Sequence, residues 1–212
     1  MKWEELMQLV GDEPVFTTAS LLAGVRSPAL VRRQLARWVQ AGKIMMLRRG
    51  VYAIRAPYAR RPLHLFLVAN ALRKASYVSL QSALSYHGMI PEHAPAVTSV
   101  TTRRPESVET PIGRFTFRHV DNRLFFGFGE PEVAPGQPAR VAGPEKALID
   151  LLYLTPGSDD RDYLRELRLE WDVAFDFEVF ETGAERTGSR KVARAARHLR
   201  ELREQQETYT SL

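Results

Sequence analysis

The sequence of 212 residues contains no cysteine, which excludes disulfide bonds and cysteine-based metal sites. It also lacks any apolar run of about 18 residues, the length that suggests a membrane-spanning helix. Its first five residues, Met1 to Glu5, are amphipathic and acidic, unlike a signal peptide. We therefore expect a protein of the cytoplasm that has no membrane partner.

Acidic residues are absent from the 78 positions between Pro14 and Pro91. At the chain average of 25 acids in 212 residues, about nine would be expected there, yet the segment contains twelve lysines or arginines. Residues 1–60 contain ten basic and four acidic residues, whereas 61–212 contain twenty and twenty-one. The net charge of +5 therefore arises in the N-terminal segment. A segment that lacks acidic residues but keeps its basic ones indicates a surface that faces a polyanion.

Local signals in the first sixty residues predict three helices. Helical spacing of apolar residues indicates a first helix over 2–10, which Gly11 ends. A second, short helix is capped by Thr17 or Thr18 and ends at Gly24.

The third helix begins at Ser27-Pro28, an N-cap residue followed by proline at the first helical position, and ends at Gly42. Its apolar stripe consists of Val31, Leu35 and Trp38. The opposite side carries Arg32, Arg33, Ala36, Arg37 and Gln40. No acid on this face balances the arginines. The face is either a solvated surface or a surface that binds phosphates and bases.

Two short β-rich runs, 44–47 and 51–54, flank Arg48-Arg49-Gly50, which predicts a hairpin with a basic tip. Three helices followed by a hairpin make the winged helix-turn-helix plan, in which the third helix enters the major groove of DNA. The predicted DNA-binding residues are Ser27, Arg32, Arg33, Arg37, Arg48 and Arg49.

The remaining sequence predicts a second domain after a linker at 56–62. We expect an α+β protein with a winged helix-turn-helix domain over 1–58 and a mixed α/β domain with a small sheet over 61–212. The expected helices are 63–74, 79–86, 144–152 and 189–206, and the expected strands are 97–102, 114–120 and 124–128. Residues 171–175 fit a strand or irregular chain.

The last predicted helix carries six basic residues, Arg190, Lys191, Arg194, Arg197, Arg200 and Arg203. They could form a second surface for a polyanion. However, glutamates four residues after three of them favour a solvated face. The acidic block at 159–181, with nine acids and three bases, could also dock against this helix.

Four segments resemble, in order, the AbiEi-type antitoxins and related regulators. These segments are Gly42 to Tyr52, Tyr77 to Gly88, Pro144 to Leu152 and Gly188 to Lys191. The resemblance implies a repressor that binds inverted repeats upstream of its own operon. It also implies neutralisation of a nucleotidyltransferase-like toxin, in a type IV system and without a stable complex between the two proteins.

Two other classes of function remain open: a regulator without a toxin, whose second domain senses a ligand or mediates assembly, and a nucleic-acid-processing enzyme. The best enzymatic candidate is a nuclease that uses Asp121, Glu145 and Lys146, but adjacent residues face different sides of a helix. Gly127-Phe128-Gly129 lacks the context of a dinucleotide loop, and the five histidines show no ligand-like pairing. We therefore expect no catalytic residues, metal or cofactor.

Overall fold

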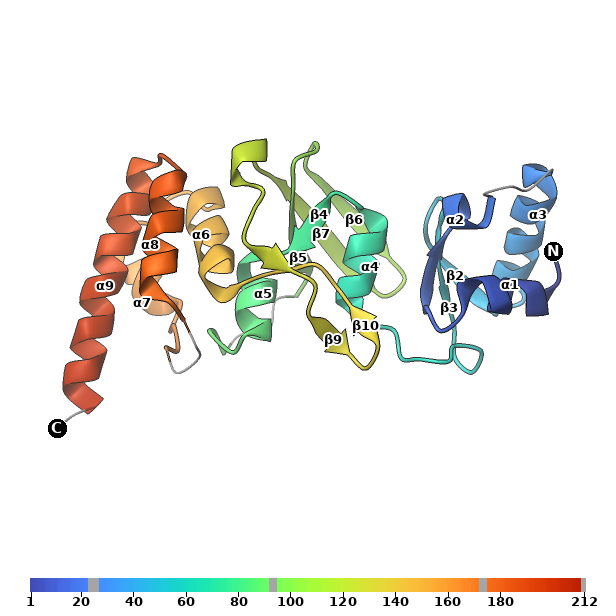
Figure 1. The fold of residues 1–212 in the computed structure, drawn as a ribbon, viewed down its shortest axis with the longest axis horizontal. Helices are drawn as coiled ribbons and strands as arrows, with labels where there is room; N and C mark the ends of the chain where they lie inside the picture. The colour runs from blue at the N-terminus through green and yellow to red at the C-terminus, as the bar shows by residue number, and fades with distance from the viewer. Residues whose placement is uncertain (23–26, 92–94, 172–174, 211–212) are drawn as a thin grey trace.

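A computed structural model describes residues 1–22, 27–91, 95–171 and 175–210. The chain forms a mixed α/β protein whose N-terminal part and C-terminal helices lie at opposite ends (Figure 1). The N-terminal part consists of α1 (Trp3–Val10), β1 (Val15–Thr17), α2 (Thr18–Leu22), α3 (Pro28–Gln40), β2 (Ile44–Arg48) and β3 (Val51–Ile54). These elements confirm the helices predicted over 2–10 and from Pro28. The predicted end of the second helix, Gly24, lies outside the described residues.

The strands of the N-terminal part form an antiparallel sheet in the order β1-β3-β2. One face of this sheet packs against the helices through Phe16, Ile44 and Ile54. The helices contribute Leu6, Leu35 and Trp38, all at most 5% exposed, to the same core. Trp38 also meets Trp3 edge-to-face, with ring centroids 5.2 Å apart.

The other face of this sheet belongs to a different core. Leu47, Val51 and Ala53 belong to the same hydrophobic core as α4 (Leu65–Leu72) and the rest of the larger part. Because side chains alternate along a strand, the N-terminal sheet is covered by one core on each face. We call the contact made by Leu47, Val51 and Ala53 the joint.

The larger part is built on a mixed sheet in the order β6-β7-β5-β4-β11-β8. Its strands are β4 (Ser76–Val78), β5 (Val97–Thr101), β6 (Glu106–Thr110), β7 (Gly113–His119), β8 (Phe128–Gly129) and β11 (Val141–Ala142). The strands β9 (Glu132–Ala134) and β10 (Gln137–Pro138) form a separate antiparallel pair. The longest pairing is parallel, between β5 and β7, and places Val97 opposite Phe115.

Helices pack around this sheet and extend away from it (Figure 1). They are α5 (Leu80–Tyr86), α6 (Pro144–Leu154), α7 (Arg161–Glu166), α8 (Phe177–Arg186) and α9 (Arg190–Thr210). The helix α6 is buried along most of its length, as its apolar sequence predicts. No helix in the described part of the chain is both long enough and apolar enough to cross a membrane.

The strand predicted at 124–128 is wrong. A short 3₁₀ helix occupies Asn122–Leu124, and only Phe128–Gly129 pairs as a strand. The two aromatic residues at the centre of this run have other contacts. The Phe125 ring lies 5.1 Å from the Tyr77 ring between centroids, and the Arg186 guanidinium lies 3.9 Å from the centre of the Phe126 ring. The ambiguous segment 171–175 falls mostly on 172–174, outside the described residues.

Candidate nucleic-acid interface

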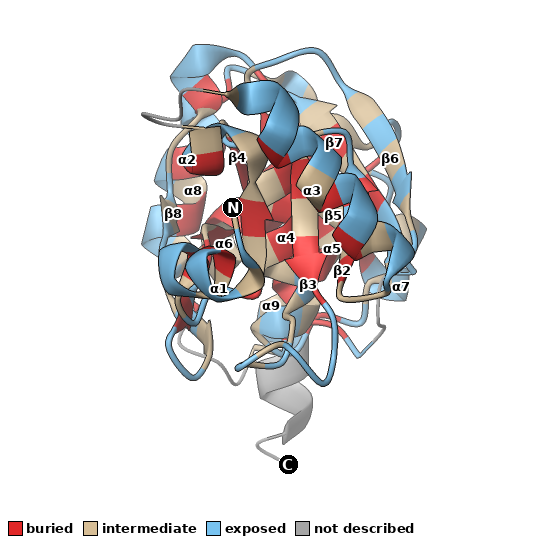
Figure 2. Cartoon of the chain, turned by 90° about the vertical axis from the view of Figure 1, so that its right-hand side faces the viewer, coloured by how far each residue is buried: buried red, intermediate tan, exposed pale blue. Residues whose placement is uncertain are grey.

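The helix α3 presents a basic face to solvent. Its apolar stripe of Val31, Leu35 and Trp38 is buried, as predicted. Arg32, Arg33, Ala36, Arg37 and Gln40 are exposed. Figure 2 views the molecule from the N-terminal end and shows this exposed side along α3. Packing of the stripe thus fixes the direction in which the arginines project.

The start of α3 follows the predicted pattern in its backbone. Ser27 is the N-cap residue and Pro28 occupies the first turn. However, the Ser27 side chain makes no capping hydrogen bond. Its hydroxyl therefore accepts no hydrogen bond from the backbone N–H groups in the first turn of the helix, which the side chain of an N-cap residue usually satisfies.

The tip of the β2–β3 hairpin consists of Arg49 and Gly50. Gly50 adopts a φ of +86°, a conformation that glycine adopts readily and other residues rarely adopt. Its carbonyl accepts a hydrogen bond from the Thr18 N–H at 2.8 Å, which ties the tip to the start of α2. Arg49 is exposed.

Arg48, the other predicted hairpin arginine, contacts the larger part of the molecule instead. It pairs across the ladder with Val51, whose side chain belongs to the joint. Its Nη1 donates to Oε1 of Glu106 on β6 at 2.8 Å, and Arg73 pairs with the same carboxylate. Burial raises the pKa of Glu106, but hydrogen bonds and attraction from Arg48 and Arg73 outweigh it and leave the pKa below its usual value.

Other cations from the acid-free segment also have structural partners. The Lys43 ammonium lies 4.8 Å from the centre of the Trp3 ring. Arg60 and Arg61 each pair with Asp12 at 3.3 Å. These contacts engage Lys43 and two arginines of the linker. They do not account for the arginines on α3.

No ion pair or side-chain hydrogen bond involves Arg32, Arg33, Arg37 or Arg49 within the parts of the chain that the structure describes. All four are exposed. We call Arg32, Arg33, Arg37 and Arg49 the free arginines. The predicted hairpin arginines therefore differ: Arg49 is free and Arg48 is held by Glu106.

A second polar cluster lies inside the larger part. Asp150 on α6 is 1% exposed. It accepts hydrogen bonds from the Tyr77 hydroxyl at 2.9 Å and from the Ser79 hydroxyl at 2.7 Å, and it pairs with Lys146 one turn earlier on α6. Burial raises the pKa of Asp150 and lowers that of Lys146, and the attraction between the two opposes both shifts.

Sequence reasoning did not find this cluster, although the spacing of Lys146 and Asp150, four residues apart on one helix, was a usable signal. The cluster joins two segments that are distant in the sequence, 77–88 and 144–152. The hydrogen bonds from Tyr77 and Ser79 to Asp150 link α6 to β4 and to the start of α5. The pair with Lys146 lies within α6 and balances the buried charge of Asp150.

The residues of the nuclease alternative point to different partners. Lys146 turns inward to Asp150. Glu145 accepts a hydrogen bond from the Asp176 N–H at 2.8 Å. Asp121 lies 3.9 Å from the Arg123 guanidinium. In the described ranges, no group of three histidines, aspartates or glutamates could hold a metal ion.

Three of the basic residues predicted on α9, Lys191, Arg194 and Arg200, have partners within the larger part. Arg194 pairs with Asp159 at 2.7 Å, and Arg200 pairs with Glu181. Lys191 donates to the carbonyls of Tyr153 and Thr155. The acidic block at 159–181 thus docks against this helix, as the sequence suggested.

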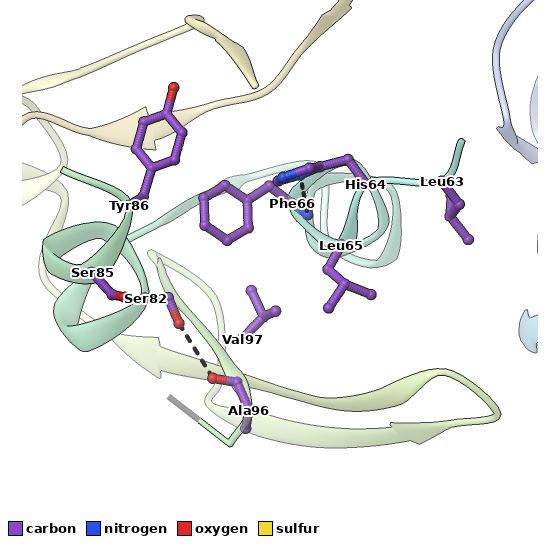
Figure 3. A pocket seen from close by; sticks show the side chains of 9 residues that line it. All are labelled: Leu63, His64, Leu65, Phe66, Ser82, Ser85, Tyr86, Ala96 and Val97. Atoms are coloured by element: carbon purple, nitrogen blue, oxygen red, sulfur yellow. Dashed lines mark hydrogen bonds between the residues drawn. The ribbon is translucent and has the colours of Figure 1, made fainter. Parts of the chain in front are cut away.

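A cavity of about 410 Å³ lies between the start of α4, the helix α5 and the strand β5 (Figure 3). Leu65, Phe66 and Val97 give it an apolar wall. Two of its polar groups are already engaged. The Ser82 hydroxyl donates to the Ala96 carbonyl at 3.2 Å, and Nδ1 of His64 accepts from the Phe66 N–H at 3.2 Å. Burial lowers the pKa of His64, which favours its neutral form.

Comparison with known proteins shows the fold alone. No family model matches the chain, and no curated protein matches it. Among solved structures, it is similar to the Rv2827c protein from Mycobacterium tuberculosis, with a TM-score of 0.53 and 18% sequence identity. The match covers 92% of this chain and 74% of that chain. Because so much of this chain is covered, the similarity extends over both the N-terminal part and the larger part.

Proposed function

We propose that this protein is a sequence-specific transcription regulator that binds double-stranded DNA through α3 and the tip of the β2–β3 hairpin. The observation that carries the proposal is the set of free arginines. They are exposed, unpaired within the described residues and drawn from a segment without acid. Arginine binds phosphate oxygens and guanine edges through its planar fork of donors.

The order of elements in the N-terminal part supports this proposal. Two helices and a short strand precede α3, and a hairpin follows it, with all three strands in one sheet. We propose that this order corresponds to the winged helix-turn-helix plan, in which the third helix enters the major groove. The faces of α3 fit that role, since its apolar stripe is buried and its basic side is open.

The test compares the wild type with the triple variant Arg32→Ala, Arg33→Ala, Arg37→Ala. Binding to duplexes selected by the wild type should fall at least about 100-fold in the variant, because each phosphate contact contributes to affinity and to its salt dependence. Arg197→Ala, which removes an exposed arginine of α9, is the matched control. Equal affinity of a folded triple variant and the wild type would contradict the proposal.

We further propose that the regulator represses its own operon and acts as antitoxin to a nucleotidyltransferase-like toxin, in line with its resemblance to the AbiEi-type proteins. Support comes from the buried cluster: the resembling segments 77–88 and 144–152 meet at Asp150. Tyr77 and Asp150 are 73 residues apart in the sequence, yet their contact brings the two segments to one place in the fold.

Co-expression with a toxin from the adjacent gene tests this second proposal, with a promoter reporter in the same cells. The full-length triple variant should lose repression and retain protection if neutralisation resides in the larger part. Full-length chains are required because the joint is shared by both parts. If wild-type protein gives no protection against a proven toxin, the antitoxin proposal fails while DNA binding stands.

A further inference from the structure

The first turn of α3 exposes a large apolar side chain beside the free arginines. Leu30 is 59% exposed, whereas Leu35 on the buried stripe of the same helix is 0% exposed. Leu30 is not part of the hydrophobic core of the N-terminal part. An apolar group at this place is suited to contact something that binds to α3.

Leu30 lies on the same ridge of α3 as Arg33 and Arg37. Positions i, i+3 and i+7 fall on one side of an α-helix, because each turn takes about 3.6 residues. Arg32 lies about 100° around the helix from Arg33. The ridge also borders Ala29, which is exposed and too small to hold the helix away from a partner.

The rise along α3 matches the spacing of bases. Leu30 and Arg33 are three residues apart, which gives about 4.5 Å along the helix axis. Successive bases of one DNA strand are about 3.4 Å apart. Two side chains at this separation can therefore reach adjacent base pairs from one helix.

We propose that Arg33 reads a guanine in the major groove and that Leu30 contacts the methyl group of a neighbouring thymine. This inference rests on the proposed DNA binding by α3. The guanidinium can donate to both O6 and N7 of guanine, and the thymine methyl is the apolar feature of the major-groove edge. Arg32 then faces the wall of the groove, where it contacts phosphate and contributes no sequence preference.

The experiment starts with selection of randomised duplexes by the wild-type protein. Enriched duplexes should share a guanine next to a thymine. That thymine is then replaced by uracil, which removes only the C5 methyl group. Wild-type affinity should fall about fourfold, the contribution of one buried methyl group. Leu30→Ala should bind thymine and uracil duplexes equally well.

The guanine is tested by base substitution. Wild type should lose about 10- to 100-fold in affinity when this guanine is replaced, whereas Arg33→Ala should lose most of that discrimination. Arg32→Ala should weaken all duplexes by a similar factor and keep the discrimination. The control is Leu9→Ala, which removes a 67% exposed leucine on α1 and should preserve both preferences.

Each failure has a distinct meaning. If replacing thymine by uracil lowers the affinity of wild type and of Leu30→Ala by the same factor, the proposed role of Leu30 is overturned. Full guanine discrimination in Arg33→Ala would overturn the role of Arg33, although DNA binding would stand. A Leu30→Ala variant that changes oligomeric state instead would overturn the inference by assigning Leu30 to a contact between protein chains. If wild type enriches no duplex, the proposed function itself fails.

Discussion

The outward face of α3 and the inward face of the N-terminal sheet use the same amino acid in opposite ways. On α3, arginines project into solvent without partners among the described residues. On the sheet, Arg48 is held by Glu106 at the edge of the larger part. Arg48 and Arg49 are adjacent in sequence, yet Arg48 has a partner in the larger part and Arg49 is one of the free arginines.

This difference shows what an excess of positive charge in a sequence can and cannot reveal. The acid-free segment supplies cations both to the joint and to the outward surface. Acids that come from outside the segment, Asp12 and Glu106, take up several of them. The charge that remains available to a polyanion is therefore smaller than the sequence suggests and more concentrated on α3.

The largest expected effect on stability concerns Lys146, a cation buried inside the larger part. Asp150→Ala leaves the Lys146 ammonium without its partner in the interior, so the free energy of unfolding should fall by about 3–5 kcal/mol. Urea unfolding at neutral pH measures the loss. Asp162→Ala, which breaks an exposed pair with Arg165, should leave the midpoint nearly unchanged. A loss below about 1 kcal/mol would show that Lys146 finds another partner or is neutral.

The joint can be tested at two adjacent residues of β2. Leu47 is 3% exposed and Met46 is 48% exposed. Leu47→Ala should lower the free energy of unfolding by about 2–3 kcal/mol, as expected for a cavity in a packed core. Met46→Ala should change it by less than about 0.5 kcal/mol. Equal effects in denaturant unfolding would mean that the inward face is not packed in solution.

The two hairpin arginines should differ in DNA binding. Arg49→Ala should reduce the slope of log affinity against log salt by about 0.9, the value for one phosphate contact. Arg48→Ala should leave this slope unchanged, because its guanidinium is engaged with Glu106. Fluorescence titration of selected duplexes at several salt concentrations measures both slopes. The same reduction in each variant would indicate that DNA draws Arg48 away from Glu106.

The smallest effect is a pH dependence at the joint. The pKa of Glu106 is lowered in the folded protein from its usual value of 4.5. Its ionised form therefore stabilises the fold above pH 4.5, and this stabilisation is lost as the pH falls through the lowered pKa. Glu106→Gln should cost less than about 1 kcal/mol at pH 7. The difference in free energy of unfolding between wild type and Glu106→Gln should become smaller below pH 4.5. A difference that stays constant with pH would show that the ionisation of Glu106 is not its cause.

Sequence periodicity was sufficient where one face of an element is buried. The stripe of α3 and the apolar helix α6 follow directly from the spacing of their large side chains. The strand β6 was missed because its alternating residues, Glu106 to Thr110, are mostly polar and lie at the edge of the sheet. The helices α7 and α8 were also missed, although Asp160 and Asp176 cap their first turns in the way that marks a helix start.

In the candidate site too, the sequence predicts features that depend on local spacing but not those that depend on tertiary contacts. Exposure of Arg32, Arg33 and Arg37 follows from helical spacing within thirteen residues. The partner of Arg48 does not, because Glu106 lies 58 residues away and is brought close only by the joint. The Asp150 cluster depends on tertiary packing in the same way, since its members Tyr77 and Ser79 precede Asp150 by more than 70 residues.

The joint also limits how freely such a domain can be exchanged between proteins. A recombination event that moved residues 1–58 into another chain would carry Leu47, Val51 and Ala53 with it and expose them unless the new chain offered a matching surface. The three side chains and α4 must therefore change together during evolution. Substitutions at Leu30 and Arg33 meet no such constraint, because both side chains are exposed.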